Sequence, residues 1–193
     1  MRPVETGRMM YNTKMVNFHV MIVHFPIALL TLYAIMEIIS IKKLSALPYW
    51  FYLKAILVIL GVLGAVAAQL AGGLIEDKFG YVRDVVEMHA LFAAITTSLF
   101  FIISLAYLLV WFKKEGGFEL HKFFAENALG RMLKSASVIS EKCINSPLIK
   151  LAALVGLITL TVTAALGGAI AFGSSVDPIA SFIFNLFSFK ESI

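Results

Sequence analysis

Four long apolar segments constrain this chain more than any other feature of its sequence. They cover approximately residues 19–40, 49–74, 88–112 and 148–172, and charged or turn-forming residues separate them. A helix of about 20 residues, at 1.5 Å per residue, spans the roughly 30 Å hydrocarbon core of a bilayer. The sequence therefore predicts an all-α integral membrane protein, with four transmembrane helices in a single membrane domain over residues 1–193.

The composition excludes several other classes of protein. Hydrophobic residues make up 60% of the chain and charged residues only 15%, which is unlike an ordinary cytosolic enzyme. The net charge of +4 comes from basic residues beside the apolar segments, so we expect no nucleic-acid partner. A single cysteine, Cys143, cannot form an internal disulfide, a c-type haem attachment or an iron–sulfur site.

The first apolar segment contains Pro26, which could start or bend a helix. A helix that began at Pro26 would be too short to cross a membrane. We therefore place Pro26 inside the first turns, where it leaves the carbonyl of Ile22 without its usual partner and bends the helix beside His24. No small-residue cleavage site follows this segment, so we expect it to remain as a membrane span.

The distribution of cations predicts the topology. Of the 16 Lys and Arg residues, ten lie in or beside the first and third connections, namely Lys42, Lys43, Lys54, Lys113, Lys114, Lys122, Arg131, Lys134, Lys142 and Lys150. Cytoplasmic loops of membrane proteins carry an excess of Lys and Arg. We expect a multi-pass protein of the bacterial inner membrane, with both termini outside the cytoplasm and the third connection inside it.

Two shorter helices are expected outside the spans. Residues 118–142 carry apolar side chains at helical intervals with cations between them, which predicts an interfacial helix against anionic lipid. Asp177 and Pro178 have the pattern of a helix cap and first turn, so a Phe-rich interfacial helix is expected over residues 179–189.

A weak internal repeat relates the two halves of the chain. Small residues on one face of the second segment recur 95 positions later in the fourth, as Gly61, Gly64, Ala68, Gly72 and Gly73 and then Gly156, Thr159, Thr163, Gly167 and Gly168. His24 in the first segment is matched 65 positions later by His89 in the third. This pattern predicts two helix hairpins related by duplication, with a site between them.

The two matched histidines suggest the axial ligands of a b-type haem. Neutral imidazoles on separate helices can bind the iron from opposite sides, and glycines let the flat macrocycle approach a helix. We expect His24 and His89 as ligands, Gly64, Gly72 and Gly167 beside the macrocycle, and Arg83 at a propionate. The alternatives are that the small residues only pack helices, and that each histidine bonds a backbone carbonyl or holds another metal ion.

Three other polar residues in the spans have open roles. His19 lies about 140° around the helix from His24, so we expect a structural or interfacial role, with metal ligation as the alternative. Glu37 is expected to pair with Lys42 or Lys43 near the helix end rather than to conduct protons. Gln69 donates a hydrogen bond either to a cofactor or across helices.

The stretch His19–Leu30, with the sequence H-V-M-I-V-H-F-P-I-A-L-L, resembles the signature of a family of small four-helix bacterial membrane proteins of unknown function. Members commonly have two histidines five apart followed by Phe-Pro-Ile-Ala-Leu, a small-residue and Asp ending of the second helix, here Ala71–Asp77, and a histidine opening the third, here His89. The similarity covers about the first 110 residues. Val20 stands where members often have Pro. The resemblance groups His19, His24 and His89 but implies no activity.

These features favour a b-type cytochrome subunit that passes electrons between a quinol or periplasmic donor and a partner redox complex. Part of the acidic second connection could dock a soluble cytochrome. One alternative is a cofactor-free structural or assembly subunit, and another is a divalent-metal binding or transport protein. No nucleophile elbow, phosphate loop or metalloprotease motif is present in the sequence, so we expect no independent catalytic activity.

Overall fold

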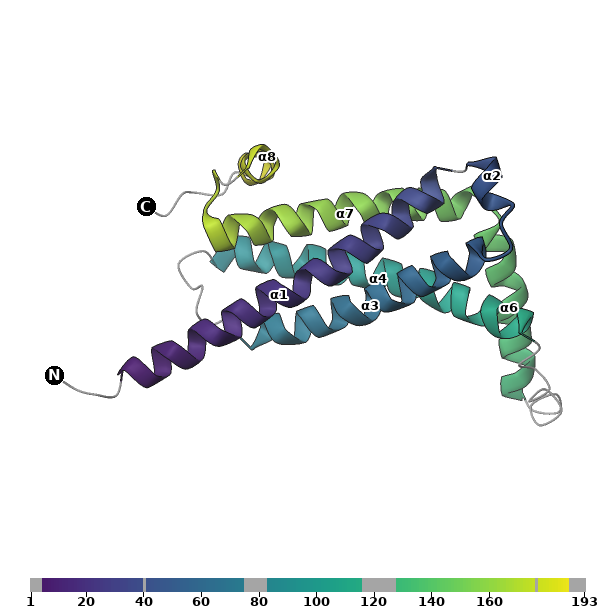
Figure 1. Ribbon diagram of the computed structural model, residues 1–193, viewed down its shortest axis with the longest axis horizontal. Helices are drawn as coiled ribbons and strands as arrows, with labels where there is room; N and C mark the ends of the chain where they lie inside the picture. Colours follow the sequence, from purple (N-terminus) through teal and green to yellow (C-terminus); the bar gives the residue numbers. More distant parts are fainter. Residues whose placement is uncertain (1–4, 40, 75–82, 116–127, 176, 188–193) are drawn as a thin grey trace. The chain divides into compact units, whose positions relative to one another are not determined.

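The computed structural model describes residues 5–39, 41–74, 83–115, 128–175 and 177–187 (Figure 1). Within these ranges all regular elements are helices and none is a strand. The helices, in chain order, are α1 (Glu5–Ile38), α2 (Lys42–Ser45), α3 (Trp50–Gly73), α4 (Arg83–Lys114), α6 (Ala128–Ile144), α7 (Pro147–Phe172) and α8 (Pro178–Leu186). The all-helical class predicted from the sequence is confirmed.

Four of these helices are long and apolar enough to cross a membrane. The candidate spans are His19–Ile38, Trp50–Gly73, Arg83–Lys114 and Pro147–Phe172. At most 39% of the most apolar window of any span is buried within the protein. The remaining apolar side chains face outward, as lipid-exposed helices require. Four apolar helices therefore fit a multi-pass protein in a lipid bilayer.

Two local predictions from the sequence are confirmed. Pro26 lies inside α1, which continues through it to Ile38, but α1 begins at Glu5, so Pro26 is not in the first turns where the sequence placed it. Asp177 caps α8, because its carboxylate accepts hydrogen bonds from the backbone N–H groups of Ile179 and Ala180 at 2.8 Å, with Pro178 in the first turn. The predicted interfacial helix over 118–142 is seen from Ala128 onward as α6, and its earlier residues lie outside the described part of the chain.

The chain forms two compact units, and every span contributes to both. The first unit comprises Met1–Ala28, Leu63–Thr97 and Ile158–Ile193. The second comprises Leu29–Val62 and Ser98–Leu157. His19, His24 and His89 therefore belong to the first unit.

The core of the first unit joins α8 to the spans. Its buried members come from α4, α7 and α8, and they are Val85, Val162, Ala165, Leu166, Ala169, Ile183 and Phe184. The core of the second unit is aromatic: the buried Tyr33 ring meets Phe100 and Tyr107 edge to face, with centroids 6.1 and 5.8 Å apart. Such aromatic pairs add to the stabilisation that burial provides.

Candidate functional site

Two histidines of the first unit have the same environment. His19 Nδ1 lies 3.1 Å from the carbonyl oxygen of Ala68, and His89 Nδ1 lies 2.9 Å from that of Thr163. A carbonyl can only accept, so each Nδ1 carries the proton and donates. The Nε2 atom of each neutral ring then keeps its lone pair, which is the form of imidazole that binds iron or another metal.

Each of these rings also lies against a glycine. A Cβ atom built on Gly72 would be 3.1 Å from His19 Cε1, and one built on Gly167 would be 3.1 Å from His89 Cε1. That distance is shorter than ordinary van der Waals contact. The glycines are therefore needed for the histidine rings of α1 and α4 to approach the backbones of α3 and α7.

The two contacts are related by constant sequence offsets. Ala68 and Gly72 correspond to Thr163 and Gly167 at the predicted offset of 95, and the histidines correspond at an offset of 70. His19 therefore makes the contacts in α1 that match those of His89 in α4, whereas the predicted match of His24 with His89 is not tested by these contacts. The same offsets hold in the second unit, where Gly61 contacts Leu30 and Gly156 contacts Phe100.

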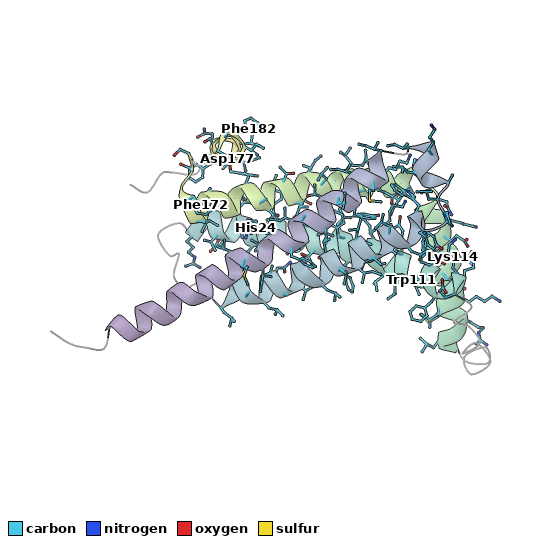
Figure 2. The ribbon with its side chains drawn as sticks, viewed as in Figure 1. His24, Trp111, Lys114, Phe172, Asp177 and Phe182 are labelled. Atoms are coloured by element: carbon cyan, nitrogen blue, oxygen red, sulfur yellow. The ribbon has the colours of Figure 1, made fainter. Side chains whose placement is uncertain are left out.

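His24 lies on an exposed face of α1 (Figure 2). Its Nδ1 lies 2.6 Å from the carbonyl oxygen of Val20, one turn earlier in the same helix. Its exposed neighbours include Met21 and Phe25. The opposition of His24 and His89 across the protein stays a prediction.

The glycines expected beside a haem contact side chains of a neighbouring helix. A Cβ atom on Gly64 would be 2.9 Å from Phe25 Cδ1 and 3.2 Å from Pro26 Cδ. Gly72 and Gly167 contact the histidines in the same way. These contacts agree with the alternative in which the small residues allow helices to pack closely. Their contact with a macrocycle stays a prediction.

Two other residues of the first unit with expected polar contacts are Arg83 and Gln69. Arg83 Nε donates to Glu87 Oε1 at 2.7 Å, and both side chains are exposed. The Gln69 amide donates to the Ala93 carbonyl and to the Thr97 hydroxyl of α4. Gln69 therefore forms hydrogen bonds across helices, which is one of the two roles predicted for it.

The second unit contains a buried ion pair between Glu37 and Lys54 that we did not predict from the sequence. Glu37 is almost fully buried, and its carboxylate accepts from Lys54 Nζ at 2.9 and 3.1 Å. Tyr107 Oη donates to the same carboxylate at 2.6 Å. Lys54 on α3 therefore supplies a cation that was not predicted; no ion pair with Lys43 is seen, and the side chain of Lys42 lies outside the described part of the chain. The sequence feature that could have predicted this pair is Lys54 within the second apolar segment, because a cation inside a membrane span needs a partner of opposite charge.

The Tyr33 hydroxyl is buried beside this pair. Within the described part of the chain it has no hydrogen-bond partner. Buried polar groups nearly always have one. Tyr33 is therefore the one described side chain whose buried polar atom is left unsatisfied.

No larger ligand cluster accompanies the histidines among the described residues. In those ranges no three His, Cys, Asp or Glu side chains are grouped so that they could hold a metal ion. Comparisons with models of protein families, with curated proteins and with solved structures gave no match.

Proposed function

We propose that this chain is a membrane subunit that binds a b-type haem between His19 and His89 and carries electrons in a redox complex. The observation that supports this function is the shared environment of the two imidazoles. Each donates Nδ1–H to a backbone carbonyl and keeps Nε2 for a metal. Histidines that bind metals almost always donate their other ring N–H in this way, which fixes the ring and its tautomer.

The donor set suits haem better than a bare divalent ion. The neutral imidazoles of His19 and His89 would hold the iron of a haem, whereas a bare divalent cation would need further ligands from the protein or from water. When bound, haem b would supply the one-electron chemistry. The protein's part is to hold His19 and His89 through Ala68 and Thr163 and to keep both rings against glycines.

Two repeated hairpins, α1–α3 and α4–α7, are part of the proposal. Matching contacts at constant offsets support a duplication, in both the histidine–glycine pairs and the Gly61 and Gly156 contacts. Parallel repeats in membrane proteins commonly enclose a site between them. A site that takes one imidazole from each repeat follows this principle.

We further propose the inner membrane of a bacterium as the location, with both termini outside the cytoplasm. The cations beside α2 and in α6 support this topology through the positive-inside rule. The histidines would then lie toward the outer side, where a quinol, a periplasmic redox subunit or a soluble cytochrome can exchange electrons.

A cofactor-free structural subunit is the second candidate. The specific observation in its favour is that each histidine already closes a contact between two helices by a hydrogen bond and a glycine contact. Hydrogen bonds between helices and small residues at their contacts are the usual means of helix association in membranes.

The absorption spectrum of the purified protein in detergent, before and after titration with haem, separates these candidates. We expect a Soret band and sharp α and β bands on reduction, with their loss in His19→Ala and in His89→Ala. His24→Ala is the matched control and should keep the spectrum, because His24 bonds only within its own helix among the contacts described.

Each other result contradicts the proposal in a different way. Loss of the haem spectrum in His24→Ala but not in His19→Ala would restore the pair expected from the sequence. A colourless protein that takes up no haem and contains no metal would support the structural candidate. Stoichiometric metal without porphyrin would support a metal-binding protein.

A further inference from the structure

The helix α6 is held at the ends of two spans in the second unit. The Lys113 ammonium at the end of α4 pairs with the Glu141 carboxylate of α6. The hydrogen bond and charge of Lys113 lower the pKa of Glu141, as expected for a carboxylate that pairs with an ammonium group. Only Asn145 and Ser146 separate α6 from the start of α7. In Figure 1, α6 runs across the end of α4.

The face that α6 turns toward the protein is small and polar. Its buried residues are Gly130, Ser137 and Ser140, and the two serines are only 2% and 8% exposed. Several large apolar side chains of α6 are on the outside, since Leu129, Met132 and Ile139 are 54%, 68% and 62% exposed, whereas Leu133 and Ile144 are half-buried. This helix therefore presents apolar surface outward, beyond its contacts with the protein.

The three most exposed apolar side chains share one line along α6 with the half-buried Ala136 and the exposed Cys143, whereas Val138, which is 39% exposed, lies on another face. Residues 129, 132, 136, 139 and 143 follow one another at alternating steps of three and four, which places them on one face of a helix. We call this line the outer stripe; it consists of Leu129, Met132, Ala136, Ile139 and Cys143.

Cations flank the outer stripe on the side away from the protein. At about 100° per residue, Arg131 and Lys142 lie roughly 100° around the helix from the stripe. Lys134 lies on the opposite side of the helix from the stripe. Both Arg131 and Lys142 are exposed. An apolar line with cations beside it is the pattern of a helix that lies in a membrane interface.

We propose that the outer stripe of α6 lies in the headgroup region of the bilayer, where Arg131 and Lys142 bind phosphate groups of anionic phospholipids. The attachment of α6 to the ends of α4 and α7 places it at the membrane surface, and the apolar stripe then has the hydrocarbon boundary to contact. Positive charge beside the stripe selects anionic lipid, because cations near a membrane surface are attracted to negatively charged headgroups. This proposal does not depend on haem.

The single cysteine of the chain lies in the outer stripe and reports on it directly. The full-length protein, labelled at Cys143 with an environment-sensitive fluorophore, is reconstituted into vesicles of phosphatidylcholine with and without phosphatidylglycerol. We expect quenching by aqueous iodide to fall several-fold when phosphatidylglycerol is included, and quenching by lipid-attached nitroxide to rise. The control carries Cys143→Ser and Lys134→Cys, and its label should remain accessible to iodide in both vesicles.

Two further variants guard against effects of the label or of folding. A label at Ile139→Cys, with Cys143→Ser, should repeat the result for Cys143. Substituting both cations, Arg131→Gln and Lys142→Gln, should remove most of the difference between the two lipid compositions. Equal access of iodide to Cys143 in both vesicles would overturn the proposal. So would shielding that depends on protein density rather than on lipid charge, because it would identify a second copy of the chain as the partner.

Discussion

At the scale of single residues, two tyrosines of the same core differ in one hydrogen bond. The Tyr107 hydroxyl donates to the Glu37 carboxylate, whereas the buried Tyr33 hydroxyl has no partner among the described residues. A hydrogen bond to a charged group contributes about 1.5–3 kcal/mol, and an unsatisfied buried hydroxyl costs about 1–3 kcal/mol. We therefore expect the Tyr107 hydroxyl to contribute more to the free energy of unfolding than the Tyr33 hydroxyl does.

Removing each oxygen in turn tests this difference. We expect Tyr107→Phe to lower the free energy of unfolding by about 1–3 kcal/mol, because Glu37 loses a donor. Tyr33→Phe, its matched control, should leave that free energy unchanged or raise it. Denaturant unfolding in one detergent provides the measurement. An equal loss in both variants would mean that the Tyr33 hydroxyl has a partner.

At the scale of helices, the packing of α1 on α3 and of α4 on α7 depends on where glycines occur. Gly72 and Gly167 lie under histidine rings, whereas a Cβ on Gly73, the next residue of α3, would have no atom within 4 Å. The same substitution at Gly72 and at Gly73 should therefore change the stability of the protein differently. The difference depends on contacts with the neighbouring helix rather than on the intrinsic helix propensity of the residue.

Substituting each of these glycines with alanine and measuring the melting temperature tests that difference. We expect Gly72→Ala and Gly167→Ala each to lower the melting temperature, since the ring must shift and overpacking costs about 1–3 kcal/mol. Gly73→Ala should be neutral or slightly stabilising, because alanine favours a helix more than glycine does. Thermal unfolding followed by circular dichroism gives the order. Equal melting temperatures for all three variants would contradict the histidine–glycine contacts.

At the scale of the whole molecule, the proposed topology puts α6 and the connection that contains α2 on one side of the membrane. The next connection, between α7 and α8, then lies on the other side. In this proposal the side of α2 and α6 is the cytoplasmic one, because the cations of the chain are concentrated in and beside these helices. Each side can therefore be identified from a single exposed position.

Accessibility of engineered cysteines tests the topology. In the Cys143→Ser background, Lys134→Cys should react with a membrane-impermeant maleimide only after intact bacterial cells are opened. Ser175→Cys, between α7 and α8, should react from outside without opening them. Both side chains are exposed in the structure, so neither is shielded by the protein. The reverse order of reaction would invert the topology.

The helices of this protein could be predicted from the sequence because their causes are local. The membrane spans follow from runs of apolar residues, and the start of α8 follows from Asp177 and Pro178. Pro26 inside α1 was predicted from the length a span requires. Each of these features depends on neighbours within a turn or two of helix, and the sequence lists those neighbours directly.

Which side chains meet was decided by tertiary structure. Offsets of 65 and 70 both align a histidine of the first span with His89, and the sequence does not choose between them. A shift of five residues turns a helix by about 140°, so only the rotation of α1 against α3 brings His19, and not His24, to Gly72. In the same way, Glu37 contacts Lys54 because of where α1 and α3 approach each other. Apolar composition determines that a helix enters the membrane, whereas packing determines which of its faces contacts another helix.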